Sequence, residues 1–249
     1  MLNVIYIFWL RQVKRYLRNK PRIIGSVGQP LMFLIALGFG LNPIFEKAMQ
    51  VSYIQFLVPG VIGLTLLFTA MFSGIELIWD RRFGFLKETL VAPIPRFSIM
   101  LGKTLGGATV AVLQGILVFL LSFIFGFHLV NPWLIPLWLA GAYLISILFT
   151  AFGLAIATQL DDTSSFPLII NFVMFPLFFL SGALFPLDNL PGGLDLATRL
   201  NPLTYGIDAM RYSLIGEAHN SMLLDFGVLL LVSGLFLAIG SYLFSKIRI

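Results

Sequence analysis

One short stretch of this chain gathers the charged side chains that a protein uses to form ion pairs or to bind a charged surface. The chain has only 16 basic and 11 acidic residues, yet six of them lie within positions 79–96, WDRRFGFLKETLVAPIPR. The aromatic residues Phe83 and Phe85 stand among them, and long uncharged runs lie on both sides. This mixture predicts recognition of another protein through charge and apolar contact.

Residues that commonly carry catalysis or hold metals are scarce. The chain has no cysteine, which excludes disulfides and thiolate ligands, and its two histidines, His128 and His219, lie far apart in the sequence. The tripeptide GKT at 102–104 resembles the end of a phosphate-binding loop, but such a loop needs a glycine where this chain has Phe97. We therefore predict no catalytic residue, no metal site and no cofactor in this chain, and a protein that is not an enzyme.

The composition is that of an integral membrane protein. Hydrophobic residues make up 59% of the chain and charged residues 11%, with a mean hydropathy of +0.97. A soluble domain carries about 25% charged residues. This chain therefore cannot cover itself with a polar surface in water, and we expect it to contact membrane lipids.

Long uncharged runs predict the membrane crossings. A helix needs roughly 20 apolar residues to cross the hydrocarbon core, and the chain has six runs of sufficient length. We expect an all-α fold, a single transmembrane domain over residues 1–249 with six transmembrane helices. A GxxxG pattern, Gly102 and Gly106, indicates close helix packing near the third. The six runs are 23–45, 48–75, 104–127, 133–160, 166–187 and 226–245.

The basic residues predict the orientation. Thirteen of the 16 lie before the first run, in the loop 79–103 or in the C-terminal tail, which all face one side of a six-helix protein. By the positive-inside rule, both termini are cytoplasmic, and we expect the membrane to be the plasma membrane. The basic pI of about 9.6 is then a topology signal, and it does not indicate nucleic acid as a partner.

Residues 1–21 predict an amphipathic helix in the cytoplasmic membrane interface. Apolar residues recur there at helical spacing and basic residues occupy the opposite face. Trp9 and Tyr16 are the expected interfacial anchors, and Pro21 ends the helix.

The loop 79–103 admits two interpretations. A short helix with aromatic residues and mixed charges suits docking into a groove on a cytoplasmic partner. Alternatively, the loop is a solvated connector whose basic residues only set the topology. Glu76, close to the cytoplasmic end of the second helix, is expected to pair with Arg81 or Arg82.

Two segments carry a family resemblance. ELIWDRRFGFLKETLVAP (Glu76–Pro93) and FFLSGALFPLDNLPGGLDLATRLNPLTYGIDAMR (Phe178–Arg211) resemble the permeases of type-2 ABC exporters, a family that includes drug, nodulation-factor and O-antigen exporters. In such permeases the loop after the second helix is a coupling helix that sits on an ATPase subunit. The resemblance therefore implies a set of ATPase-coupling residues here: Glu76, Asp80, Arg81, Arg82, Phe83, Gly84, Leu86, Lys87 and Glu88.

The resemblance also implies partners. ATP and Mg would be bound by a separate ABC ATPase subunit, present in two copies, and the permease would act as a homodimer or beside a paired permease. The cargo would be an amphipathic drug, a lipid or a lipid-linked glycan moved out of the cell.

The outer segment 188–222 is expected to start a helix at Asn201 and Pro202, because a capping residue followed by proline is a strong start signal. Asp208 and Arg211 are three residues apart on that helix and are expected to form a local ion pair. The family resemblance suggests short re-entrant helices here that close the pathway. The expected outer-gate residues are Pro186, Asn201, Pro202, Tyr205, Asp208 and Arg211.

Two other classes of protein fit the sequence less well. A membrane-embedded enzyme acting on lipids needs clustered catalytic residues, which the two distant histidines do not provide. A channel or secondary transporter working without an ATPase predicts intramembrane charges or inverted repeats, and no repeat is detectable. Neither class gives the charged loop a use.

Overall fold

The computed structural model describes residues 1–49, 52–91, 93–187 and 191–247, and within these ranges it contains helices and no strand. Residue 92 of the predicted loop and residues 188–190 of the predicted outer segment lie outside the described residues. The α-helices are α1 Leu2–Arg18, α2 Lys20–Phe33, α3 Gly40–Met49, α4 Tyr53–Phe72, α5 Ile75–Arg82, α6 Phe85–Val91, α7 Arg96–Ser122, α8 Ile135–Thr158, α9 Ser165–Phe179, α10 Gly192–Leu200, α11 Pro202–Ile215 and α12 Met222–Ser245. The π-helix η1 (Leu34–Phe39) joins α2 to α3, and the 3-10 turns η2 (Phe123–Phe125) and η3 (Pro132–Leu134) flank the link between α7 and α8.

Five of the described helical segments are long and apolar enough to cross a membrane, which confirms an all-α, multi-pass membrane protein. They are Lys20–Phe45, Tyr53–Arg82, Arg96–Phe125, Pro132–Thr158 and Met222–Ser245. The predicted run 166–187 corresponds to α9, which has only 15 residues. At 1.5 Å per residue it is about 22 Å long, shorter than the hydrocarbon core. Its final turn gives way to non-helical backbone at Leu180.

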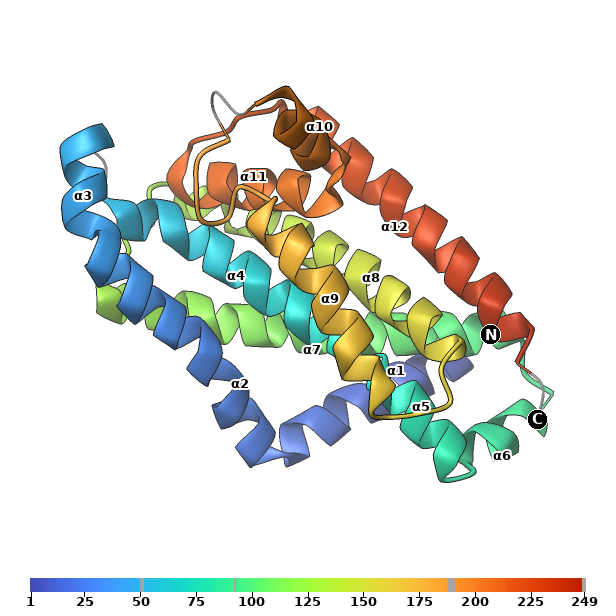
Figure 1. Ribbon diagram of the computed structural model, residues 1–249. Helices are drawn as coiled ribbons and strands as arrows, with labels where there is room; N and C mark the ends of the chain where they lie inside the picture. Colours follow the sequence, from blue (N-terminus) through green and yellow to red (C-terminus); the bar gives the residue numbers. More distant parts are fainter. Residues whose placement is uncertain (50–51, 92, 188–190, 248–249) are drawn as a thin grey trace.

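The centre of the molecule is α4, of which 16 of 20 residues are buried. Helices α7, α8 and α11 pack around it, and α2 and α9 also lie against it (Figure 1). The helices approach closely where glycines meet: a Cβ on Gly153 of α8 would lie 2.4 Å from the Met71 carbonyl oxygen of α4. Any side chain at Gly153 would therefore push these two helices apart. Helix α12 packs on α8 and keeps most of its apolar surface exposed.

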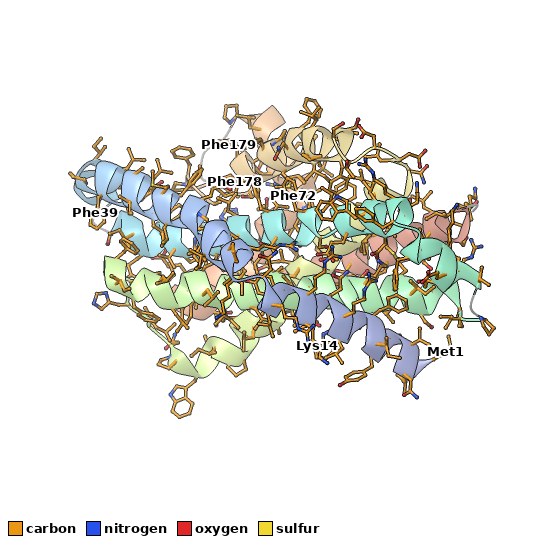
Figure 2. The ribbon with its side chains drawn as sticks, turned by 90° about the horizontal axis from the view of Figure 1, so that it is seen from below. Met1, Lys14, Phe39, Phe72, Phe178 and Phe179 are labelled. Atoms are coloured by element: carbon orange, nitrogen blue, oxygen red, sulfur yellow. The ribbon has the colours of Figure 1, made fainter. Side chains whose placement is uncertain are left out.

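Helix α1 lies along α7 at the underside of the molecule, with Lys14 exposed (Figure 2). The predicted GxxxG pair forms this contact. A Cβ on Gly102 would lie 2.8 Å from Phe8 Cβ, and one on Gly106 would lie 2.6 Å from Gln12 Cβ. Close packing at these glycines is thus confirmed, and their partner is the N-terminal helix.

The expected anchors of that helix face the protein. Tyr16 is 3% exposed, and the Trp9 Nε1 donates a hydrogen bond to Thr109 Oγ1 at 2.9 Å. Tyr16 is therefore not a membrane anchor, whereas Trp9 is half-buried and the interfacial position of this helix stays a prediction. Sequence periodicity predicts a stripe of apolar and aromatic residues in 1–21, but it does not distinguish a membrane surface from a neighbouring helix as the surface that this stripe contacts.

The outer segment forms α10 and α11, which lie together at the end of the bundle opposite α5 and α6 (Figure 1). The predicted helix start is confirmed: the Asn201 side chain accepts a hydrogen bond from the Leu203 backbone N–H at 3.0 Å, and Pro202 is the first helical residue. Gly216 ends α11 with a φ of +81°, which glycine adopts without strain.

Candidate functional site

The charged segment forms two short helices with a sharp turn between them. Helix α5 continues the line of α4 as far as Arg82, and α6 begins at Phe85. Gly84 has a φ of +82°, so the turn needs a residue without a Cβ. Phe83, at the tip of this turn, is 77% exposed, which is unusual for a phenylalanine beside an ordered turn.

The two carboxylates of α5 are buried and form ion pairs with basic residues of other helices. Asp80, which is 4% exposed, bonds the Arg11 guanidinium at 2.9 Å and also bonds the Lys103 ammonium. Lys103 is itself 2% exposed. These two ion pairs of Asp80 therefore connect α5 to both α1 and α7.

Glu76 is bonded to the N-terminal part of the chain. The Arg22 Nη1 lies 3.0 Å from one oxygen of Glu76, and the Arg15 guanidinium lies 3.7 Å from the other. The predicted pairing of Glu76 with Arg81 or Arg82 was wrong, because those residues lie five and six positions along the helix and face elsewhere.

Arg81 bonds the end of another membrane helix. Its guanidinium donates to the Thr158 carbonyl at 3.0 Å and the Leu160 carbonyl at 3.2 Å, and it pairs with Asp161. A cation at a helix C-terminus satisfies carbonyls that lack helical partners. Arg81 therefore joins α5 to the end of α8 and to the α8–α9 link.

The predicted coupling residues divide between inside and outside. Arg82, Phe83, Lys87 and Glu88 are exposed, Arg81 and Gly84 are half-buried, and Glu76, Asp80 and Leu86 are buried. A partner that docks on this segment would first meet the exposed group, whereas the buried residues hold the segment to the membrane helices.

A cleft of about 510 Å³ lies between α1 and α5–α6. Its walls combine the basic residues of α1 with aromatic rings, and the Arg11 guanidinium stacks 3.5 Å from the centre of the Phe85 ring. The sequence patterns do not reveal this cleft, because the amphipathic pattern of α1 predicts that its basic face lies at the membrane interface. The lining residues are Arg11, Lys14, Arg15, Arg18, Trp79, Asp80, Phe83 and Phe85.

At the opposite end, Asp208 and Arg211 bond different parts of the outer segment. Asp208 accepts backbone hydrogen bonds from His219 at 2.8 Å and Asn220 at 2.7 Å. Arg211 donates to the Gly182 carbonyl at 2.9 Å and lies 4.0 Å from the centre of the Phe56 ring. No ion pair joins Asp208 to Arg211 among the described residues, so the predicted pair was wrong. Burial lowers the pKa of Arg211 to about 10, although the charges of Asp208 and Glu217 oppose this shift.

The other expected gate residues surround the same region. Pro186, Asp208 and Arg211 line a cavity of about 200 Å³. The Asn201 amide donates to the Leu177 carbonyl at 2.6 Å, which holds the end of α9. The Tyr205 hydroxyl donates to the Arg199 carbonyl at 2.7 Å and so binds α11 to α10. These contacts hold the outer segment against α9 and α4.

Metal-binding groups do not gather in the parts of the chain that the structure describes: no cluster of three or more histidine, aspartate or glutamate side chains there could hold an ion. The ionic side chains of α5 instead form contacts between helices.

The protein is helical and multi-pass, and its charged, partly exposed α5–α6 segment is bonded to several of its membrane helices. This arrangement has the form of a membrane transport subunit. The chain belongs to the ABC-2 type transporter family, which matches residues 3–215. It is therefore a membrane permease of the ABC-2 type, and this family implies pairing with an ABC ATPase subunit.

Several relatives agree with this assignment. The inner membrane transport permease YadH of Escherichia coli K12 is 30% identical over 227 residues, covering 89% of this chain and 86% of its own. Nodulation protein J of Rhizobium leguminosarum is 28% identical over 210 residues, covering 83% of this chain and 80% of its own. A ycf38 protein of Cyanophora paradoxa, which is named as a transport permease, is 30% identical over 247 residues and covers 93% of this chain and 84% of its own.

Proposed function

We propose that this permease moves an amphipathic drug, lipid or lipid-linked glycan out of the cell, with ATP and Mg bound and hydrolysed on a separate ATPase subunit. The observation that carries the proposal is the charged segment α5–α6. It exposes Arg82 and Phe83 to a partner and is bonded, through Glu76, Asp80 and Arg81, to other helices of the bundle.

The bonds of α5 suggest how force would pass inward. A displacement of the exposed turn by the ATPase would move Asp80 against Arg11 of α1 and Lys103 of α7. The same displacement would move Glu76 against Arg22 of α2, and Arg81 against the end of α8. Because these contacts are direct and the Glu76 and Asp80 carboxylates are buried, the helices would respond together instead of one at a time.

The assembly that we propose contains two permeases and two ATPase subunits. Either two copies of this chain or this chain and a sister permease would form the membrane part. Helix α9, extended by the stretch that follows it, would complete a sixth crossing. Both termini and the α5–α6 segment would face the cytoplasm in the plasma membrane, because the basic residues concentrate there.

The outer segment would close the pathway on the opposite side. Helices α10 and α11 would enter the membrane without crossing it, as short re-entrant helices. The contacts of Asn201, Asp208 and Arg211 with the backbone around them would hold this gate shut between transport cycles.

The experiment is co-purification of the permease with a candidate ATPase encoded next to it. We expect Arg82→Glu and Phe83→Ala to weaken co-purification or to uncouple ATP turnover, because both side chains are exposed at the tip of the segment. Arg199→Glu in α10 is the control: it reverses an exposed arginine at the other end of the molecule and should leave the complex intact. If the permease purifies alone and the α5–α6 variants behave as wild type, a channel or secondary transporter working without an ATPase becomes the better hypothesis.

A further inference from the structure

A polar groove runs into the membrane part of the molecule between α2, α4 and α7. We call it the α2–α4–α7 groove and define its polar lining as Arg22, Ser26, Gln29, Thr65, Thr69 and Gln114; its volume is about 170 Å³. Apolar residues complete it, including Phe68 and Phe72, which carry edge contacts to Phe175 and Phe166 of α9. One wall is thus polar and the outer edge is aromatic.

Most of the polar lining lies at membrane depth. Gln29 is seven residues beyond Arg22 and so about 10 Å further along α2, and Gln114 is eleven residues beyond the ion-paired Lys103, about 16 Å along α7. Polar side chains in membrane helices generally face a neighbouring helix, a cavity or a ligand. Three polar residues on one face of α2, at positions 22, 26 and 29, therefore indicate that this face is not adapted to lipid chains.

The amide nitrogen of Gln114 has no hydrogen-bond partner among the described residues. The side chain is 2% exposed, and the unpartnered Nε2 is buried. Buried polar atoms are nearly always hydrogen-bonded, so this donor requires an acceptor that the described part of the chain does not supply. A ligand oxygen in the groove would satisfy it.

Arg22 supplies the charge at the mouth of the groove and also connects it to α5. Arg22 bonds Glu76 at 3.0 Å, while Arg15 lies 3.7 Å from the other oxygen of the same carboxylate. Two arginines thus face one glutamate, and the cluster carries one excess positive charge. If Arg22 turned to an anion, Glu76 would keep Arg15 as its partner.

We propose that the α2–α4–α7 groove binds the negatively charged headgroup of an amphiphile, with Arg22 as its charge partner and Gln114 as a hydrogen-bond donor. The apolar part of the ligand leaves past Phe68 and Phe72 toward α9. The inference rests on the proposed function, since it narrows the cargo to anionic amphiphiles. It also gives Arg22 a second role: because Arg22 bonds Glu76, occupation of the groove alters the contact that joins α2 to the α5–α6 segment.

The absence of cysteine from this chain makes a labelling test direct. In the full-length permease in phosphatidylcholine nanodiscs, Thr69→Cys should react at least about tenfold faster with an anionic than with a cationic methanethiosulfonate, because the excess positive charge concentrates anions. Leu235→Cys, which is 52% exposed on the apolar surface of α12, is the control and should react with neither reagent.

Ligand protection then tests the headgroup. Dioctanoyl phosphatidylglycerol should protect Thr69→Cys from labelling, whereas dioctanoyl phosphatidylcholine or inorganic phosphate at the same concentration should not. Gln114→Leu and Arg22→Gln should each abolish protection, and Gln55→Leu, the same change on α4 outside the groove, should preserve it.

Three results would overturn the proposal: no reaction at Thr69→Cys, equal rates with both reagents, or equal protection by inorganic phosphate and the anionic lipid. The last of these would assign the groove to free anions. Because the assay contains the permease alone, its failure is distinguishable from failure of the proposed ATPase coupling.

Discussion

The buried contact between Asp80 and Lys103 provides the most quantitative prediction. Both side chains are almost fully buried, at 5% and 2% exposure. Removing one partner of such a pair leaves the other charge uncompensated, which costs about 3–5 kcal/mol. The two single substitutions should nevertheless differ, since Asp80 has a second partner in Arg11, whereas Lys103 forms no other ion pair among the described residues.

Asp80→Asn should therefore be the more damaging change. It strands the Lys103 ammonium and should cost the full 3–5 kcal/mol or so, which corresponds to a fall of roughly 10 °C in the unfolding midpoint for a chain of this size. Lys103→Met leaves Asp80 with the half-exposed Arg11 and should cost about half as much. The double variant should recover part of the loss, with a coupling free energy of about 2 kcal/mol.

Thermal unfolding of the purified permease, followed by circular dichroism in one detergent, measures all four midpoints. Lys87→Met on α6 is the matched control, because Lys87 is exposed and surface substitutions usually change stability by about 0.5 kcal/mol or less. Equal midpoints for wild type and both single variants, or strictly additive losses in the double variant, would refute the argument that this pair binds α5 to α7.

Three further predictions concern other parts of the molecule. Gly106→Val should detach α1 from α7 and cost about 1–3 kcal/mol, since even a Cβ would lie 2.6 Å from Gln12. The fluorescence of Trp9, in a background where the other tryptophans are replaced by phenylalanine, should report the detachment, and Gly227→Val, where nothing lies within 4 Å of a Cβ, should not change it. Asp208→Ala should increase amide exchange at His219 and Asn220, whose N–H groups lose their acceptor; unchanged exchange would mean that the carboxylate does not order this turn. Hydrogen bonds from Ser164 and Ser165 lower the pKa of Asp162 from 3.8 to about 2. The ionised Asp162 should therefore order the start of α9 fully above pH 4, and this ordering should be lost as the pH falls through 2. Nuclear magnetic resonance of the Ser164 and Ser165 amides measures this loss, and Asp162→Asn should remove the pH dependence.

The sequence was most informative where the deciding interaction is local. The start of α11 follows from Asn201 and Pro202, because a cap and its proline act within one turn. The all-helical, multi-pass architecture follows from apolar runs whose length alone is decisive. Close packing at Gly102 and Gly106 was also predictable, although the glycines themselves do not identify α1 as the partner.

Interactions between distant segments were not predictable in this way. Glu76 pairs with Arg22, 54 positions away, and no local pattern distinguishes that arginine from the nearer Arg81. The Asp208–Arg211 spacing suits an ion pair on an isolated helix, but the His219 and Asn220 amides and the Gly182 carbonyl offer each side chain a better partner once the outer segment has folded. The length of α9 likewise depends on where tertiary contacts hold the chain after Phe179.

The basic residues near the N-terminus illustrate why topology and mechanism are difficult to separate in such a sequence. Their number predicts orientation, whatever their partners. In the folded chain, however, Arg11, Arg15 and Arg22 form ion pairs with the two carboxylates on α5, in addition to the Lys103 pair. A substitution that preserves charge but not geometry, such as Arg22→Lys, would retain the topology signal while weakening the contact with Glu76. The proposed coupling therefore depends on the identity of these residues, whereas orientation depends only on their charge.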